Sequence, residues 1–244
     1  MKKIKNYILG FCAITLAIAC SSSDDNGNNT TNSIKPSKYT VAEVGDTPYS
    51  LFFEYNGDLI KRVTTDFGNT ITINYNSNNT INNYIVQNTG EPSETFTATY
   101  QNNLLTELKN NTNTERTLFY YDSNNRVNKT DYYESGFLTT EFYQYDGNGN
   151  VIQSNDNYST FQYTYNTLNN PFKNVFPQID AEVSWYWFGS LVNNQTIVKE
   201  KLSTSTTFTT KYTYTYETNS SNYPTKRIQR NLSGNITETV TYEY

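Results

Sequence analysis

A tyrosine recurs along this chain, and each copy ends a run in which polar and apolar residues alternate. The series comprises Tyr55, Tyr75, Tyr100, Tyr121, Tyr145, Tyr165 and Tyr216. The first six copies are separated by 20, 25, 21, 24 and 20 residues, and each is followed by a polar turn and a second apolar run. This interval fits one β-hairpin and its connection, so the sequence predicts one hairpin repeated many times.

The alternation is clearest in residues 209–216, where Tyr212, Tyr214 and Tyr216 share one face and threonines the other. A period of two residues over this length is typical of a β-strand. The same pattern recurs in residues 70–75, 95–100, 161–165 and 237–244. Asn-Gly at residues 56–57 and Asp-Gly at residues 146–147 are hairpin-turn signals.

Composition supports an ordered β-protein. Hydrophobic residues make up only 35% of the chain, but aromatic residues reach 16%, with 23 tyrosines. Disordered chains are poor in aromatic and β-branched residues, which instead suit pleated, half-buried surfaces. We therefore predict an all-β fold, a long antiparallel up-and-down meander of roughly 14–16 strands. So many strands must coil, so we expect a barrel-like or half-barrel sheet.

Two units carry a family resemblance. Residues 121–127 (Tyr-Asp-Ser-Asn-Asn-Arg-Val) and 145–152 (Tyr-Asp-Gly-Asn-Gly-Asn-Val-Ile) resemble the Tyr-Asp repeats of Rhs-type shell proteins. With Asn170-Pro171-Phe172 and the Tyr-rich terminal strands, residues 48–244 also resemble a Bacteroidota lipoprotein family of unknown function that is porin-like in shape. The other units have Asn, Gln or Glu after the tyrosine, a departure from the Rhs pattern.

The N-terminus resembles a lipoprotein leader. A basic start with Lys2, Lys3 and Lys5 precedes an apolar stretch over residues 8–19, which is too short for a permanent membrane helix. Residues 17–20, Ala-Ile-Ala-Cys, resemble a lipobox, which implies a signal peptide over residues 1–19 and lipidation of Cys20. An ordinary secretory signal is the alternative. Cys12 lies within the leader, so the mature chain cannot form an internal disulfide.

Residues 20–38 are predicted to be a flexible polar tether, since no apolar residue occurs between Cys20 and Ile34. Its Ser-Asp-Asp run at residues 23–25 resembles the export signal of surface lipoproteins in the Bacteroidota. The resemblance implies a lipid-anchored outer-membrane protein at the cell surface; a periplasm-facing linker is the alternative. The tether leads into a single repeat-built β domain, residues 39–244.

The repeat is interrupted at residues 171–194, an irregular aromatic insertion that holds both tryptophans. One interpretation is a loop or short helix packed across the sheet and filling its mouth. The other is a ligand platform for sugar rings or another apolar ligand, and its candidate residues are Trp185, Tyr186, Trp187 and Phe188. Burial of the tryptophans would favour the first interpretation, and exposure the second.

Catalytic chemistry is not expected. The chain has no histidine and no cysteine outside residues 1–20, which removes histidine-dependent nucleophiles and His- or Cys-based metal sites. We predict no enzyme, cofactor or metal; the minor alternative is a carboxylate-based glycoside hydrolase using Asp180 and Glu182.

The mildly acidic charge, without a basic stripe, excludes nucleic acid as a predicted partner. A mean hydropathy of −0.73 and a polar face opposite the tyrosines also disfavour a transmembrane barrel.

The sequence therefore predicts a location more clearly than a molecular role. The membrane is the expected partner through the N-terminal lipid. The role we favour is a binding or adhesion module for a glycan or a protein. The alternative is a structural or assembly component of the cell envelope without a small ligand. The sequence does not indicate an oligomeric state.

Overall fold

The computed structural model describes residues 34–173, 175 and 192–244. In this part of the chain there are sixteen β-strands, and no helix is long and apolar enough to cross a membrane. The strands are β1 (Lys38–Glu43), β2 (Tyr49–Asn56), β3 (Leu59–Thr65), β4 (Thr70–Tyr75), β5 (Ile81–Gln87), β6 (Glu94–Gln101), β7 (Leu104–Asn110), β8 (Arg116–Tyr121), β9 (Val127–Glu134), β10 (Phe137–Tyr145), β11 (Val151–Asn155), β12 (Ser159–Asn169), β13 (Asn193–Leu202), β14 (Thr209–Thr218), β15 (Pro224–Asn231) and β16 (Ile236–Glu243).

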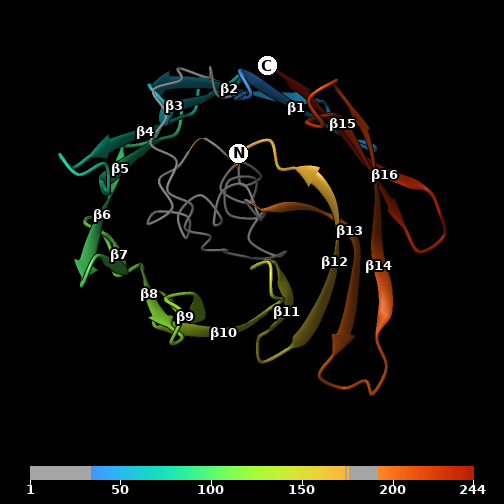
Figure 1. The fold of residues 1–244 in the computed structure, drawn as a ribbon. Coiled ribbons are helices and arrows are strands. Elements are labelled where there is room, and N and C mark those ends of the chain that lie inside the picture. Colours follow the sequence, from blue (N-terminus) through green and yellow to red (C-terminus); the bar gives the residue numbers. More distant parts are fainter. Residues whose placement is uncertain (1–33, 174, 176–191) are drawn as a thin grey trace, which may run out of the picture.

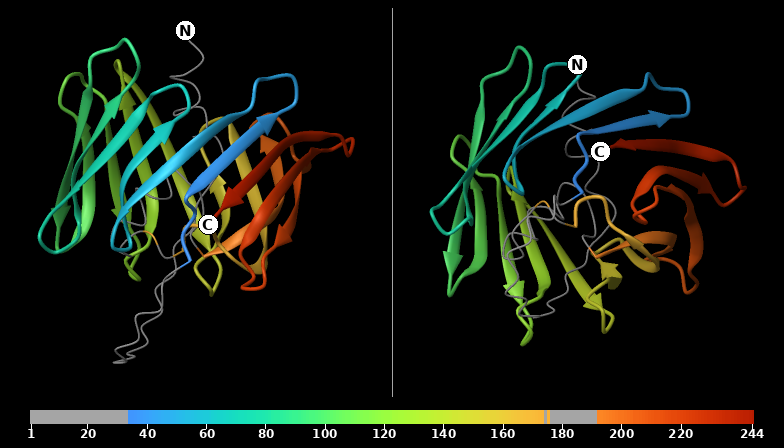
Figure 2. Two further views of the ribbon diagram at one scale, coloured as in Figure 1. Left: turned by 90° about the horizontal axis from the view of Figure 1, so that it is seen from above. Right: turned by 45° about the horizontal axis from the view of Figure 1, so that its top comes forward.

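The strands form a closed antiparallel barrel in which each strand pairs with its neighbours in the chain. The first and last strands close the ring, with Thr40 of β1 opposite Thr241 of β16. Figure 1 shows the ring along its axis, and Figure 2 shows the strands running obliquely between its two ends. The predicted all-β meander is confirmed, at sixteen strands, and the sheet is closed rather than half-open. Closure pairs the two edges that an open meander would expose.

The core of the barrel is its inward face. Alternate residues of each strand point inward, as Tyr39 and Val41 do on β1 opposite Tyr242 and Val240 on β16. The fully buried aliphatic side chains are Ile60, Ile81, Leu105, Val41, Val151, Val175, Val198 and Val240. Each such side chain stabilises the fold by roughly 1.5–3 kcal/mol. Tyrosines complete this layer, which explains a core built with few aliphatic residues.

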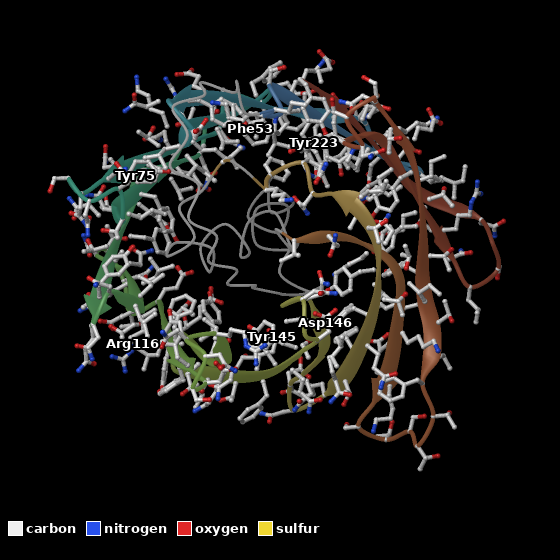
Figure 3. The ribbon with its side chains drawn as sticks, viewed as in Figure 1. Phe53, Tyr75, Arg116, Tyr145, Asp146 and Tyr223 are labelled. Atoms are coloured by element: carbon white, nitrogen blue, oxygen red, sulfur yellow. The ribbon has the colours of Figure 1, made fainter. Side chains whose placement is uncertain are left out.

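The recurring tyrosines link successive hairpins. The hydroxyl of Tyr75 on β4 donates a hydrogen bond to the carbonyl oxygen of Ile60 on β3, 2.8 Å away. Ile60 pairs with Tyr55 where the register shifts, so its carbonyl group lies beside a β-bulge. The other hydroxyl–carbonyl pairs of this type are Tyr55–Pro36 (2.6 Å), Tyr121–Leu105 (2.6 Å), Tyr145–Val127, Tyr165–Val151 (2.8 Å), Tyr216–Gln195 (2.7 Å) and Tyr244–Pro224 (2.7 Å). We call this series the tyrosine ladder; Figure 3 labels two of its members, Tyr75 and Tyr145.

The turns beside the ladder are closed by their own side chains. Asp122 Oδ1 accepts hydrogen bonds from the backbone N–H groups of Asn124 (2.8 Å) and Arg126 (3.0 Å). Asn125 in the same turn has a φ of 59°, a conformation that Asn adopts more readily than most residues. Asp146 makes the equivalent two bonds in the β10–β11 turn, to Asn148 and Asn150. The Asn- and Asp-rich composition of these segments is therefore the chemistry of tight hairpin turns.

The outward face of the barrel is mainly polar. On β6 it carries Thr95, Thr97 and Thr99, and on β4 and β5 it carries the hydrogen-bonded pair Asn74 and Asn83. The more exposed apolar side chains on the strands of this wall are Phe52, Tyr120, Leu138, Phe142 and Ile152. A membrane-spanning barrel presents a continuous apolar band to lipid. On the described wall, the exposed apolar side chains instead stand among threonine, asparagine and charged residues.

A segment after β12 crosses the ladder end of the barrel and packs against its inner wall. The ring of Phe172 contacts those of Tyr39 and Phe53, with centroid separations of 6.5 Å and 5.4 Å. The backbone carbonyl of Val175 accepts a hydrogen bond from the N–H group of Ile60. Both Phe172 and Val175 are buried. The chain that leaves β12 therefore reaches the opposite side of the ring at β1–β3.

Candidate binding face at the distal end

The two ends of the barrel differ. The chain enters at the ladder end, where Lys35 Nζ donates to the Gly57 carbonyl oxygen (2.5 Å) and pairs with Asp58 (3.0 Å). The C-terminal strand also finishes there, since the N–H group of Ser37 bonds the carbonyl oxygen of Glu243. The opposite end, which we call the distal end, is formed by the connections at residues 44–48, 66–69, 88–93, 111–115, 135–136, 156–158, 203–208 and 232–235.

Carboxylates line the inward face toward the distal end. On β6, Glu94 shares the inward face with Phe96 and Tyr100, and it begins the strand at the distal end. On β16, Glu238 is in the same position relative to Val240. The inward carboxylates of this level are Glu43, Glu94, Glu115, Glu134, Glu141, Glu200 and Glu238. We call this set the inner carboxylates.

Two of the inner carboxylates share one buried amide. Asn110, which is fully buried, donates from Nδ2 to Glu94 Oε2 (3.0 Å) and to Glu115 Oε2 (3.3 Å). The hydroxyl of Tyr132 donates to Glu115 Oε1 at 3.0 Å. Burial, and then the Glu115 carboxylate, raise the pKa of Tyr132, so this phenol remains a neutral donor. These contacts hold both carboxylates against the wall.

A third inner carboxylate, Glu141, changes charge near neutral pH. Tyr143 donates a hydrogen bond to Glu141 Oε2 (2.9 Å), and the same phenol oxygen is 2.8 Å from Thr130 Oγ1. Burial raises the pKa of the Glu141 carboxyl to about 7, and the nearby Asp156 carboxylate adds to the rise. Part of the population therefore carries a proton at this position at neutral pH.

Two further inner carboxylates form ion pairs with cationic side chains. Arg227 on β15 forms an ion pair with Glu238, and Lys211 on β14 forms one with Glu200 at 3.0 Å. Glu43 lies opposite Glu238 in the β1–β16 register; burial, and then that neighbour, raise the pKa of Glu43. In the described strands and distal connections, seven inner carboxylates face two inward cations, a formal charge of −7 + 2 = −5 with every carboxylate ionised.

Exposed apolar side chains gather at the same end. Val44 is 71% exposed, Phe137 79%, Tyr158 72% and Leu232 70%, and each lies in or beside a different distal turn. The other exposed apolar side chains at this end are Phe67, Leu138, Leu202 and Ile236. Six of the eight distal connections, all within the described residues, thus carry an apolar side chain. We call the inner carboxylates and these apolar tips together the distal face.

The ladder end carries fewer exposed apolar side chains in the part of the chain that is described. Its turns are built mainly from Asn, Asp, Gly and Ser, and the exposed large hydrophobic residues beside them are Tyr120 (40%), Ile152 (40%) and Tyr244 (39%). Large apolar side chains cost little on a surface one at a time, but their concentration at one end marks an interaction site more often than chance exposure does.

The structure does not describe the predicted site residues. Cys20 and the platform residues Trp185, Tyr186, Trp187 and Phe188 are outside the described residues, as are Asp180 and Glu182. Their predicted roles therefore remain predictions. Among the described residues, no group of acidic side chains is arranged to hold a metal ion.

Sequence reasoning missed the inner carboxylates, although the sequence carried a signal for them. Glu94, Glu115 and Glu238 each stand six residues before an inward tyrosine, namely Tyr100, Tyr121 and Tyr244. An even spacing within a strand places both residues on one face. A glutamate in phase with the tyrosines is thus predicted to point into the barrel, toward the end opposite the ladder.

Comparison with known proteins identifies the fold alone. No family model matches the chain, and no curated protein matches it. A porin-like protein from Bacteroides uniformis has a similar structure, with a TM-score of 0.52 and 15% identity over 85% of this chain and 96% of that one. A porin-like protein from Bacteroides vulgatus gives a TM-score of 0.44 and 12% identity over 86% of this chain and 98% of that one.

A third similar structure is that of a Photorhabdus luminescens Tc holotoxin pore, with a TM-score of 0.33 and 14% identity over 81% of this chain and 10% of that one. Of these three, the Bacteroides uniformis protein exceeds a TM-score of 0.5, and at 15% identity this similarity shows a shared barrel architecture alone. The class of protein defined by the fold is therefore a closed antiparallel barrel of sixteen described strands, similar in architecture to the porin-like protein from Bacteroides uniformis.

Proposed function

We propose that this chain is a lipid-anchored protein of the cell envelope that binds another protein through its distal face. The anchor is Cys20, and the residues after it form the tether. The tether leads into the barrel at the ladder end, where Lys35 and Pro36 are held by the β2–β3 hairpin. The ladder end then faces the membrane and the distal face points away from it.

The observation that supports a binding role is the concentration of apolar tips on this outward-pointing end. The tips project from short turns of a closed barrel, so their spacing is fixed before a partner arrives. A pre-organised surface loses less conformational entropy on binding than a flexible one. Aromatic and aliphatic residues on a rigid frame also match the composition of protein interface cores.

Binding fits the described residues better than catalysis. The sequence has no histidine, and the inner carboxylates Glu94, Glu115, Glu200 and Glu238 are each engaged by a neighbouring donor or cation. Such contacts hold the carboxylates in place, which suits electrostatic recognition more than proton transfer.

The anchor can be tested by labelling growing cells with radioactive palmitate. Incorporation should be lost in the Cys20→Ala variant and retained in the Cys12→Ala variant, since Cys12 lies in the predicted leader. Protease treatment of intact cells then separates the two locations. Cleavage without permeabilisation indicates the cell surface, and cleavage only after permeabilisation indicates the periplasmic side.

The binding face can be tested by site-specific photocrosslinking in intact cells. A photoreactive amino acid replaces Phe137 or Tyr158 at the distal tips, or Phe52 or Phe142 on the barrel wall as exposed aromatic controls. We expect discrete adducts from the distal positions and none from the wall. Equal adducts from both sets, or none from the distal positions, would contradict the proposed face.

A further inference from the structure

We infer that the partner of the distal face is a polypeptide segment rich in lysine and arginine with interspersed apolar residues. This inference rests on the proposed function and names the chemistry of its partner. The apolar tips define the docking face, and the charge that they surround determines the sign of the partner. The remaining question is which occupant is complementary to both features.

The distal face is negatively charged because carboxylates outnumber cationic side chains on the inward side of the barrel. The inner carboxylates come from β1, β6, β9, β10, β13 and β16 and from the β7–β8 connection, while Arg227 and Lys211 are the inward cations of the described strands. The distal connections add Asp46, Asp66, Glu91 and Asp156, which carry the same sign. A low-dielectric wall lined by one sign of charge concentrates the field in front of it and attracts opposite charge.

The raised pKa values of two inner carboxylates agree with this field. Burial comes first in each case, followed by a neighbouring acidic group: Glu238 for Glu43, and Asp156 for Glu141. A cationic side chain entering this level would offset the repulsion and lower both pKa values. Protons should therefore be released when the partner binds.

Other occupants fit less well. A metal ion needs several carboxylate oxygens at one point, and the described residues hold no such group. An anionic lipid surface would be repelled by the carboxylates, although the apolar tips alone would suit a bilayer. A basic polypeptide meets both requirements, because its cations pair with the inner carboxylates and its apolar side chains contact Val44, Phe137 and Tyr158.

The test uses the purified full chain and a labelled synthetic peptide of alternating lysine and leucine, with a glutamate–leucine peptide as the opposite-charge probe. Fluorescence anisotropy measures binding at several salt concentrations. The distal double variant carries Glu43→Gln and Glu134→Gln. The matched control carries Glu54→Gln and Glu243→Gln, which remove the same charge from outward positions near the ladder end.

We expect the lysine peptide to bind and the glutamate peptide not to bind. The distal double variant should raise the Kd of the lysine peptide about fivefold or more at low salt, and added salt should reduce this difference. The control variant should change the Kd less than twofold. Replacing Phe137 and Tyr158 with serine should also weaken binding, and that effect should persist at high salt because it removes apolar contact.

Two results would overturn the inference: no binding of the lysine peptide, or equal weakening by the distal and control variants. The second would mean that the peptide senses overall charge and not the distal face. These failures are separable from failure of the proposed function. Distal photocrosslinks to a neutral or acidic protein would keep the binding face and remove only the basic partner. Absence of position-dependent crosslinks would remove the face itself.

Discussion

At the scale of single residues, the recurring tyrosine combines two roles that are often divided between residue types. Its ring fills the inward layer, and its hydroxyl satisfies a backbone carbonyl group of the preceding hairpin. A buried carbonyl group without a partner costs about 1–3 kcal/mol, so the hydroxyl group is as important as the ring. This explains why tyrosine recurs at the ladder position where phenylalanine would supply the same apolar area.

Removing one ladder hydroxyl should therefore destabilise the fold without changing its shape. Tyr121→Phe deletes the bond to the Leu105 carbonyl oxygen. We expect the free energy of unfolding to fall by about 1–2 kcal/mol. Tyr158→Phe, at a distal tip that is 72% exposed, should change it by less than about 0.5 kcal/mol. Denaturant unfolding measures the free energy of unfolding of both variants. An equally small change in the two variants would contradict the structural role of the ladder.

A second prediction at this scale concerns Glu141. Its pKa in the folded chain, about 7, exceeds the ordinary carboxyl value of about 4.3 in an unfolded chain. The folded state therefore binds this proton more tightly. The stability that this group contributes is fully present below about pH 4.3 and is lost as the pH rises to about 7. The loss amounts to about 3 kcal/mol or less.

Glu141→Gln should remove that pH dependence. The free energy of unfolding of the variant should fall less between pH 4.5 and 7 than that of the unmodified chain. Glu54→Gln on the outward face serves as the control and should leave the pH profile unchanged. Parallel profiles for the Glu141 variant and the unmodified chain would show that this carboxyl has an ordinary pKa.

At the scale of the element, each hairpin is specified by its own turn. Strand positions and turn types followed from local signals: residues 70–75, called a strand by alternation, are the whole of β4, and residues 209–216 lie within β14. The outward threonines and inward tyrosines were likewise evident from the period of two. The inner carboxylates were not predicted, because a glutamate in a strand is usually solvent-exposed. Only its phase with the tyrosines indicated otherwise.

The β8–β9 turn provides a test at this scale. Asp122→Ala removes both backbone hydrogen bonds of Asp122 Oδ1 and the ion pair with Arg126. We expect a loss of about 1–3 kcal/mol in the free energy of unfolding. Asp122→Asn should lose less, because Asn219 Oδ1 makes equivalent bonds in the β14–β15 turn. Thermal and denaturant unfolding of both variants would measure the difference; equal losses would assign the effect to the ion pair alone.

At the scale of the whole molecule, the local sequence signals did not determine whether the sheet closes into a barrel. A meander of repeated hairpins has the same alternation whether its last strand meets its first or not. Closure depends on pairing between residues 38–43 and 238–243, about two hundred positions apart. The polar outward wall and the tyrosine-rich interior, in contrast, follow from the composition of the two strand faces. The proposed function gives the two ends of the barrel different roles because the described chain enters at only one of them, beside Gly57 and Asp58.

Disulfide trapping between β1 and β16 tests the closed barrel most directly. In a chain with both native cysteines replaced by serine, Thr40→Cys and Thr241→Cys are introduced at opposed positions of the two strands. A matched control pairs Thr40→Cys with Thr215→Cys, an outward position on β14. Mild oxidation of the folded protein, followed by mass spectrometry, should give an intramolecular disulfide in the first variant and none in the control. An open sheet would give no intramolecular disulfide in either variant, and that result would contradict the closed sixteen-stranded barrel.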